Sequence, residues 1–239
     1  MEMMRIAICD DEEIHRQKLL TLLSFYKENE KIEVVYYSCG EDLISAYQSG
    51  ERFFAIILDI ELSGIDGFST STVIREYDEK VLICFLTKFG DYVYNVINVG
   101  VFGYLVKPVK ESDFFALYRR IMKKFCEENA TITLSYKKEV TVAKMRDIVY
   151  VEYIPRLKIK VVTANDILFN YGKLMDIKEK LDENFVEINK TIVINLKYVR
   201  SVNNYEITLT MNNIKISLPE TRKREVVNRY IRHKENDSD

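Results

Sequence analysis

Continuous apolar runs alternate with amphipathic stretches along the first half of the chain. The run Phe53–Leu58 is apolar at every position and ends at Asp59, and Val81–Leu86 is a second run of this kind. A strand that is apolar on both faces is typical of the interior of a parallel sheet covered by helices. Three further segments complete a set of five predicted strands: Met4–Cys9, Ile32–Tyr37 and Phe102–Val106. The amphipathic stretches predict five helices: Glu12–Asn29, Glu41–Gln48, Gly67–Tyr77, Asp91–Val99 and Ser112–Cys126. This alternation predicts an α/β doubly wound, five-stranded parallel sheet.

Polar side chains follow four of these predicted strands. Asp10 and Asp11 come after the first strand, Asp59 after the third, Thr87 after the fourth and Lys107 after the fifth. In open α/β sheets, ligands bind beyond the carboxyl ends of the strands, so we expect these groups to share one edge. Clustered carboxylates suit Mg²⁺, and an aspartate can attack phosphorus as a nucleophile. Lysine can neutralise the transferring phosphoryl group, and the threonine hydroxyl can hydrogen-bond one of its oxygens.

With these residues in place, positions 1–126 resemble a response-regulator receiver domain, which has a flavodoxin-like fold. The resemblance rests on Asp10-Asp11, Asp59, Thr87 and the segment from Phe102 to Pro108. It implies that Asp59 is the phosphoacceptor and that a sensor histidine kinase supplies the phosphoryl group. It further implies a phosphorelay signalling role in a two-component system.

The same resemblance implies the roles of neighbouring residues. Mg²⁺ would be held by Asp10, Asp11, Asp59 and the main-chain carbonyl of Glu61. Tyr104 would be the switch aromatic, which turns inward when Thr87 moves to the phosphoryl group, and the Lys107–Pro108 bond would be cis. Lys88 is bulkier than the small residue usual after the threonine, so it is expected to restrict access to the site and to slow phosphate loss.

The pattern changes after Glu127–Ala130, a short polar segment. From residue 131 onward, period-two alternation rich in Ile, Val, Thr and Tyr predicts about nine short strands. They include Thr131–Tyr136, Glu139–Ala143, Ile148–Tyr153, Leu157–Thr163, Phe185–Ile194, Val199–Asn203, Glu206–Met211 and Ile214–Leu218. Helices are predicted only at Lys173–Leu181 and Thr221–His233. The chain is therefore expected to comprise a receiver domain (1–126), a linker (127–130), a mainly-β domain (131–236) and a tail (237–239).

The two halves carry opposite charge. Residues 1–130 have a net charge of −7 and residues 131–239 a net charge of +5, within a total of −2. A basic second half is typical of a domain that meets a polyanion.

The second half resembles the LytTR DNA-binding domain. The resemblance rests on Asp147–Glu152, on the helix at Lys173–Leu181 and on Phe185–Val199, where an aromatic residue precedes a basic run and a Val-Asn strand. It implies an elongated β protein that inserts loops into successive major grooves of double-stranded promoter DNA. Strands and loops are a known minority among DNA-reading elements.

The predicted DNA contacts come from three segments of this domain. An Asn amide can pair with adenine and a Lys can donate to guanine or phosphate. The predicted contact residues are Arg156, Lys158, Asn189, Lys190, Arg222 and Lys223, with Arg224 beside them. Two residues depart from the family's basic run: Glu187 and Asn189 stand where arginine and histidine are usual. A glutamate that faces phosphate is repulsive, so affinity or site preference is expected to differ from that of relatives. Asn195 is assigned to structure, as the cap of a strand turn.

Composition excludes several other classes of protein. No run approaches the roughly 18 apolar residues of a membrane span, and the four cysteines are scattered without a C-x-x-C pair, as expected for free thiols in a reducing cytoplasm. The two histidines are far apart, which argues against a histidine-based metal site or triad. We expect a non-enzymatic transcription regulator that dimerises on phosphorylation. Two alternatives remain open: a phosphatase that uses the same carboxylates, and an interaction protein whose basic β domain binds protein or RNA.

Overall fold

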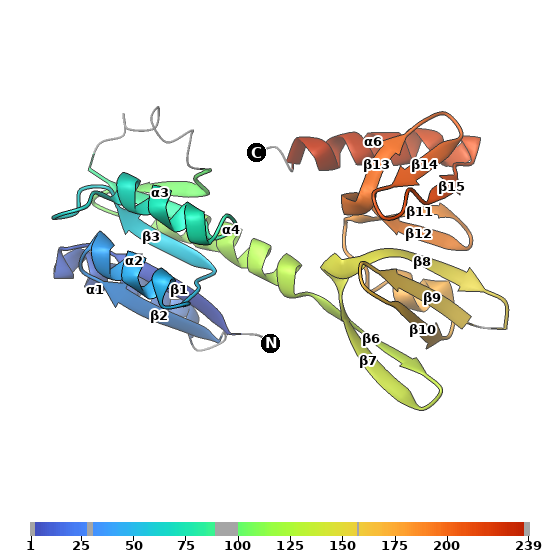
Figure 1. The fold of residues 1–239 in the computed structure, drawn as a ribbon, viewed down its shortest axis with the longest axis horizontal. Coiled ribbons are helices and arrows are strands. Elements are labelled where there is room, and N and C mark those ends of the chain that lie inside the picture. The colour runs from blue at the N-terminus through green and yellow to red at the C-terminus, as the bar shows by residue number, and fades with distance from the viewer. Residues whose placement is uncertain (1–2, 28–30, 89–99, 157, 237–239) are drawn as a thin grey trace. The chain divides into compact units, whose positions relative to one another are not determined.

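The computed structural model describes residues 3–27, 31–88, 100–156 and 158–236 (Figure 1). Contacts divide the chain into two compact units, Met1–Cys126 and Glu127–Asp239, and each is described by itself. The predicted helix Asp91–Val99 lies outside the described residues. No helix within the described ranges is long and apolar enough to cross a membrane.

The first unit contains a five-stranded, all-parallel sheet in the order β2-β1-β3-β4-β5 (Figure 1). This topology confirms the predicted doubly wound fold. The strands are β1 (Met4–Cys9), β2 (Ile32–Tyr37), β3 (Ala55–Asp59), β4 (Leu82–Thr87) and β5 (Gly103–Val106). The helices are α1 (Glu13–Lys27), α2 (Gly40–Gln48), α3 (Gly67–Tyr77) and α4 (Glu111–Asn129). Helix α4 therefore continues through most of the segment 127–130 that was expected to be a linker.

Alternate residues of the strands supply two separate apolar cores, one on each face of this sheet. In β1, Ile6 and Ile8 face a core that α1 and α4 complete with Leu23 and Phe114. Ala7 and Cys9 face the opposite core, which α2 and α3 complete with residues such as Leu43 and Ile74. Because both faces are covered, the central strands β3 and β4 are apolar up to their last residues, Asp59 and Thr87.

The second unit is mainly β, as predicted, and its antiparallel sheets contain ten described strands. The larger sheet has the order β10-β9-β8-β12-β11, and smaller sheets are formed by β13-β14-β15 and β6-β7. The strands are β6 (Thr131–Tyr136), β7 (Glu139–Lys144), β8 (Ile148–Ile154), β9 (Lys158–Thr163), β10 (Ile167–Tyr171), β11 (Phe185–Asn189), β12 (Ile192–Asn195), β13 (Val199–Val202), β14 (Glu206–Leu209) and β15 (Lys215–Ser217). The helices are α5 (Leu174–Lys178) and α6 (Glu220–Asn236), with short 3₁₀ turns at Met145–Asp147 and Leu196–Tyr198.

Two strand predictions in this unit were wrong. The stretch Phe185–Ile194 is a hairpin and not one strand, because the side-chain oxygen of Asn189 accepts hydrogen bonds from the backbone N–H groups of Thr191 (2.8 Å) and Ile192 (3.0 Å) and so closes a turn. Strand β10 was not predicted at all. It pairs antiparallel with β9, and none of its residues is fully buried, so no continuous apolar pattern marks it.

Asn195 joins two parts of the second unit, as its assignment to structure predicted. It is 1% exposed, donates from Nδ2 to the carbonyl of Ile148 (2.8 Å) and accepts from the backbone N–H of Lys197 (3.0 Å). A buried amide with both ends hydrogen-bonded fixes β8 against the end of β12.

Candidate functional site

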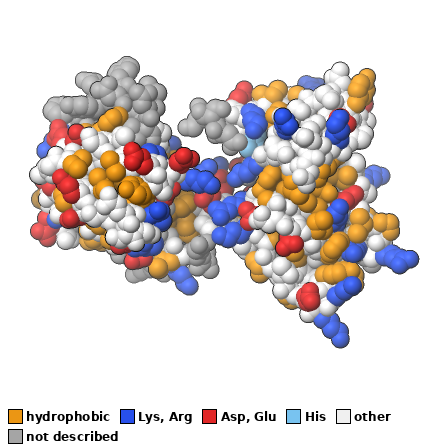
Figure 2. All heavy atoms as spheres, in the orientation of Figure 1, with side chains coloured by type: hydrophobic (Ala, Val, Ile, Leu, Met, Phe, Trp, Pro, Cys, Tyr) orange, Lys and Arg blue, Asp and Glu red, His pale blue; other side chains and the backbone are white. Residues whose placement is uncertain are grey.

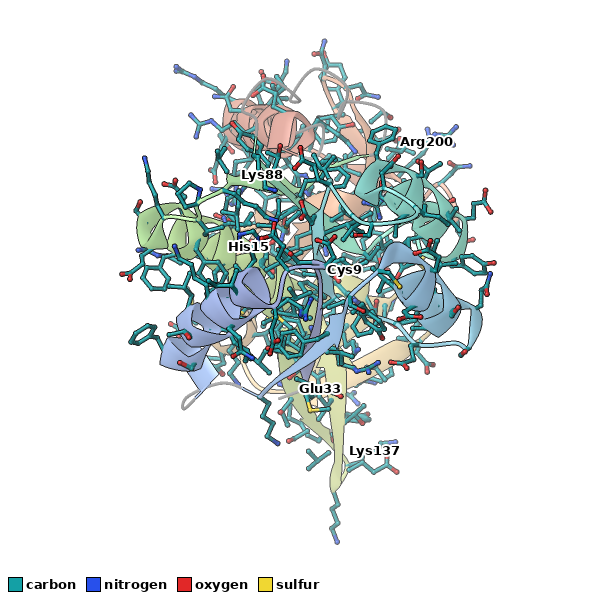
Figure 3. The ribbon with its side chains drawn as sticks, turned by 90° about the vertical axis from the view of Figure 1, so that its left-hand side faces the viewer. Cys9, His15, Glu33, Lys88, Lys137 and Arg200 are labelled. Carbon is teal, nitrogen blue, oxygen red and sulfur yellow. The ribbon has the colours of Figure 1, made fainter. Side chains whose placement is uncertain are left out.

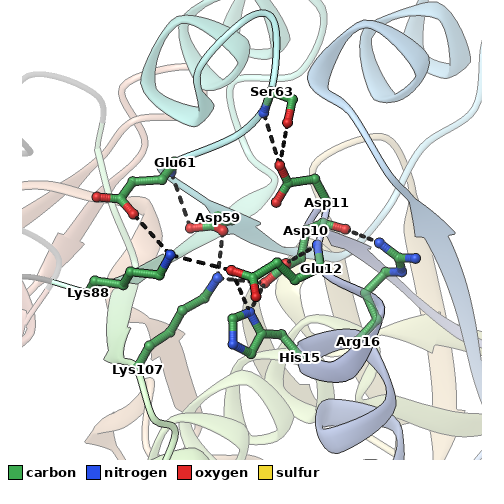
Figure 4. A network of polar contacts seen from close by, with 10 residues as sticks. All are labelled: Asp10, Asp11, Glu12, His15, Arg16, Asp59, Glu61, Ser63, Lys88 and Lys107. Atoms are coloured by element: carbon green, nitrogen blue, oxygen red, sulfur yellow. Dashed lines mark hydrogen bonds and ion pairs between the residues drawn. The ribbon is translucent and has the colours of Figure 1, made fainter.

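The carboxyl edge of the parallel sheet gathers the polar groups of the first unit (Figure 4). Asp59 ends β3 and Thr87 ends β4, whereas Asp10, Asp11 and Lys107 follow the strands on either side. Asp10, Asp59, Thr87 and Lys107 are buried. Carboxylate oxygens of Asp10, Asp11 and Asp59 lie within 4.8 Å of one another. The structure therefore brings together all five groups that the sequence placed at strand ends.

Lys107 is the central cation of this site. Its Nζ lies 2.5 Å from Oδ2 of Asp59 and 2.9 Å from Oδ2 of Asp10. Burial raises the pKa of Asp59, while the hydrogen bond and charge of Lys107 oppose that rise. One lysine shared between two buried carboxylates leaves excess negative charge, which a further cation would compensate.

Backbone groups of the loop after β3 fix the position of Asp59. The N–H of Glu61 donates to Oδ1 of Asp59 (3.2 Å), and the N–H of Gly67 donates to the carbonyl of Ile60 (3.0 Å). A Cβ at Gly67 would stand 2.0 Å from the carbonyl oxygen of Asp59. Only glycine allows helix α3 to begin this close to the residue, so the position of Asp59 depends on Gly67.

Asp11 is oriented by a contact that the sequence analysis missed. Oδ2 of Asp11 accepts from the hydroxyl (2.5 Å) and the backbone N–H (3.2 Å) of Ser63, and these bonds lower the pKa of Asp11, the hydroxyl having the largest effect. The two residues are 52 positions apart and meet only because β1 and β3 are neighbours in the sheet. No local pattern in the sequence indicates this pairing.

Charged side chains form the rim of the site. Nζ of Lys88 lies 3.3 Å from Oε1 of Glu12 and 3.5 Å from Oε2 of Glu61, so it links the loops after β1 and β3 (Figure 4). Nδ1 of His15 lies 3.4 Å from Oδ2 of Asp10. Lys88 and His15 are both labelled in Figure 3. The sequence analysis expected Lys88 to restrict the site but did not identify its partners, and it gave His15 no role.

Tyr104 lies in β5 and its side chain is 53% exposed. It pairs in register with Phe85 of β4, and Thr87 lies two residues further along the same strand. The bond between Lys107 and Pro108 is cis, as expected. The two residues that were predicted to act as a switch therefore lie on adjacent strands, with the tyrosine turned outward.

The predicted DNA contacts fall in three segments of the second unit. Arg156 and Lys158 flank the β8–β9 turn, Asn189 and Lys190 form the β11–β12 turn, and the basic residues after Glu220 start α6. These three segments lie along one edge of the unit, at the end of α6 away from the C-terminus (Figure 1).

Some of these predicted DNA-binding residues already form hydrogen bonds or ion pairs within the protein. The guanidinium of Arg222 donates to the carbonyl of Glu187 (2.8 and 3.2 Å) and pairs with Glu225 (2.9 Å). The side-chain oxygen of Asn189 accepts the hydrogen bonds that close its own turn. Its side-chain nitrogen is therefore the group that can still bind a ligand. The carboxylate of Glu187 forms an ion pair with Lys178 of α5, and this neutralises the charge that was expected to repel phosphate.

Family models match both units. Residues 6–119 match the response regulator receiver domain and residues 138–230 match the LytTr DNA-binding domain. The acidic group Asp10, Asp11 and Asp59 is typical of the Mg²⁺-binding site of receiver domains.

Curated relatives match the chain along most of its length. The transcriptional regulatory protein NatR of Bacillus subtilis (strain 168) is 24% identical over 229 residues, which is 94% of each chain. The sensory transduction protein LytT of the same organism is 24% identical over 213 residues, covering 84% of this chain and 86% of LytT. The transcriptional regulatory protein YpdB of Escherichia coli (strain K12) is 23% identical over 248 residues, covering 96% of this chain and all of YpdB. With the geometry of both units, these matches show that the chain belongs to the response regulators in which a receiver domain is followed by a LytTR DNA-binding domain.

Proposed function

We propose that this response regulator accepts a phosphoryl group on Asp59 from a sensor histidine kinase and that phosphorylation controls its binding to promoter DNA. The observation that carries the proposal is the buried Asp59 carboxylate, with Lys107 at 2.5 Å and two further aspartates within 4.8 Å. The names of the relatives NatR and YpdB as transcriptional regulatory proteins support a role in transcription. The four cysteines are free, which agrees with a reducing cytoplasm.

The transfer places the reacting charges where the structure holds compensating groups. An oxygen of the Asp59 carboxylate attacks the phosphorus of the phosphohistidine, the O–P bond forms and the N–P bond breaks. The leaving imidazole nitrogen takes the electron pair and then a proton. Nζ of Lys107, already beside Asp59, stabilises the negative charge on the phosphoryl oxygens, and the hydroxyl of Thr87 hydrogen-bonds one of them.

The donor set around Asp59 fits Mg²⁺. Carboxylate oxygens are the ligands that this ion prefers, and the carboxylates of Asp10 and Asp59 share the single ammonium group of Lys107. Asp10, Asp11, Asp59 and the main-chain carbonyl of Glu61 would hold the ion, which supplies positive charge for the phosphoryl oxygens.

Phosphorylation would reach the rest of the molecule through β4 and β5. When Thr87 moves toward the phosphoryl group, the space beside β4 accepts the ring of Tyr104, which is exposed before the change. The charge added by the phosphoryl group would then shift the equilibrium between two conformations of β4 and β5. We propose that the altered β4–β5 face favours a homodimer, which places two DNA-binding units on two half-sites.

In the second unit, Arg156, Lys158, Lys190 and Lys223 are proposed to contact DNA directly. Arg222 acts mainly by holding β11 through the carbonyl of Glu187. Asn189 would contribute its amide nitrogen alone, because pairing with adenine through both ends would break the bonds that close its turn.

The test compares two variants of the β3–α3 segment. Asp59→Asn removes the nucleophile, whereas Asp66→Asn keeps an N-cap for α3, since Asp66 accepts from the backbone N–H of Ser69 (2.7 Å). With acetyl phosphate, the wild type and Asp66→Asn should gain a phosphoryl group by intact mass, dimerise in sedimentation velocity and bind promoter fragments more tightly. Asp59→Asn should do none of these, and phosphorylation that persists in this variant would refute the assignment.

A further inference from the structure

The hairpin of β6 and β7 ends in a two-residue turn made of two lysines. Tyr136 and Glu139 are paired in register, so Lys137 and Lys138 alone form the turn, with φ angles of +47° and +70°. Turns with two positive φ angles strongly favour Asn-Gly, because side chains with a Cβ are strained there. The chain therefore keeps two positive charges at a place where neutral residues would be more stable.

Aromatic rings attach this turn to the neighbouring β9–β10 strands. The ring of Tyr136 lies 4.8 Å from that of Tyr171 and 5.4 Å from that of Phe169. Nζ of Lys158 lies 3.8 Å from the Phe169 centroid and 5.0 Å from the Tyr136 centroid, and Nζ of Lys137 lies 5.4 Å from the same Tyr136 ring. Lys137 of the hairpin and Lys158 after the β8–β9 turn thus share one set of aromatic rings, which holds the two segments together.

A hydrogen bond reinforces the attachment. The backbone N–H of Ser135 in β6 donates to the side-chain oxygen of Asn170 in β10 (2.8 Å). The hairpin tip is therefore fixed relative to the β8–β9 turn and does not depend on its own two strands alone.

The tip lies on the edge of the unit that carries the predicted DNA contacts. The β6–β7, β8–β9 and β11–β12 turns and the start of α6 all lie along this edge (Figure 1), and Figure 2 shows Lys and Arg side chains at intervals along it, including over the hairpin tip. Figure 3 labels Lys137 at the protruding end of the hairpin. Among the described residues, neither Lys137 nor Lys138 forms an ion pair with a carboxylate.

We propose that Lys137 and Lys138 form a further contact of the second unit with DNA and that they bind backbone phosphates beyond the segments that read bases. The inference rests on the proposed DNA-binding function and extends it to a fourth segment. Duplex DNA is the occupant that fits, because its regularly spaced phosphates match a row of cations along one edge. Lysine binds phosphate as a point charge without a fixed hydrogen-bond geometry, so this segment adds affinity and not sequence preference.

The experiment replaces the turn with the residues that its backbone prefers. The full-length double variant Lys137→Asn with Lys138→Gly removes both charges and is expected to fold at least as stably as the wild type, which thermal unfolding checks. Lys137→Arg with Lys138→Arg keeps the charges, and Lys110→Gln with Lys124→Gln removes two exposed charges from the first unit.

Binding to a fluorescein-labelled duplex of about 40 base pairs is measured by anisotropy between 50 and 200 mM salt. Each lost phosphate contact lowers the slope of log K against log salt by about 0.9, so the Asn-Gly variant should lose about 1.8. The affinity ratio of wild type to variant should then be about 12-fold larger at 50 mM than at 200 mM salt. The Arg-Arg and Gln-Gln variants should retain the wild-type slope.

The outcomes separate this inference from the function on which it rests. If the wild type binds with a steep salt slope and the Asn-Gly variant keeps that slope, the hairpin does not contact phosphates and the inference alone fails. An equal loss in the Gln-Gln variant would also overturn it, because the effect would then be one of net charge. A wild type that binds no duplex at all would refute both the inference and the proposed function.

Discussion

Replacing Gly67 with alanine adds one methyl group beside the phosphoacceptor. The new Cβ would stand 2.0 Å from the carbonyl oxygen of Asp59 and 2.8 Å from its carbonyl carbon, whereas ordinary contact begins near 3.4 Å. The backbone must therefore open by about 1.4 Å, and the atoms in the way cannot rotate aside. Overpacking of this kind costs about 1–3 kcal/mol of unfolding free energy. A displacement of about 1 Å at a reacting group can lower a rate about 100-fold.

The matched control is Gly50→Ala. Gly50 has a φ of +94° and open space where its Cβ would be, so alanine costs strain of about 1–2 kcal/mol without touching the site. Urea unfolding gives the two stability losses, and intact mass after mixing with acetyl phosphate gives the two phosphorylation rates. We expect comparable destabilisation in both variants and a loss of phosphorylation rate of about 100-fold in Gly67→Ala alone. Equal phosphorylation rates in the two variants would show that the backbone of Asp59 is not held by this contact.

Two further predictions concern ion pairs. Lys88→Ala removes the ion pairs across the rim of the site and should speed the loss of the phosphoryl group by up to about fivefold, since exposed ion pairs contribute up to about 1 kcal/mol. The rate at which the phosphorylated protein decays measures this effect. A slower decay in the variant would contradict the expectation. Lys178→Met leaves the carboxylate of Glu187 unpaired and should weaken binding to duplex DNA by up to about fivefold. Adding Glu187→Gln should restore the affinity, and a double variant that binds as weakly as Lys178→Met would show that the charge of Glu187 is not the cause.

The apolar pattern determined the architecture of the first unit. Strands such as Phe53–Leu58 are apolar at every position because helices cover both faces, so their ends and the residues after them could be located without coordinates. Since parallel strands in such a sheet end at one edge, the meeting of Asp10, Asp59 and Lys107 followed from the order of the elements.

The second unit was less predictable because its short strands depend on their partners. Strand β10 has no fully buried residue, and it is held by pairing with β9 and by contacts of its aromatic rings with Tyr136. The hairpin of β11 and β12 depends on one side chain, Asn189, whose turn interrupts a run that otherwise alternates as a single strand.

The sequence by itself determined which groups lie at the carboxyl edge of the sheet, because the ends of the strands are local properties of the apolar pattern and parallel strands all end at the same edge. Only the tertiary structure decided how those groups are held and which charges are compensated. Ser63 orients Asp11 across 52 residues, and Lys178 neutralises a glutamate that appeared to oppose DNA binding. Such contacts arise where separate elements pack together, and no spacing along the chain encodes them.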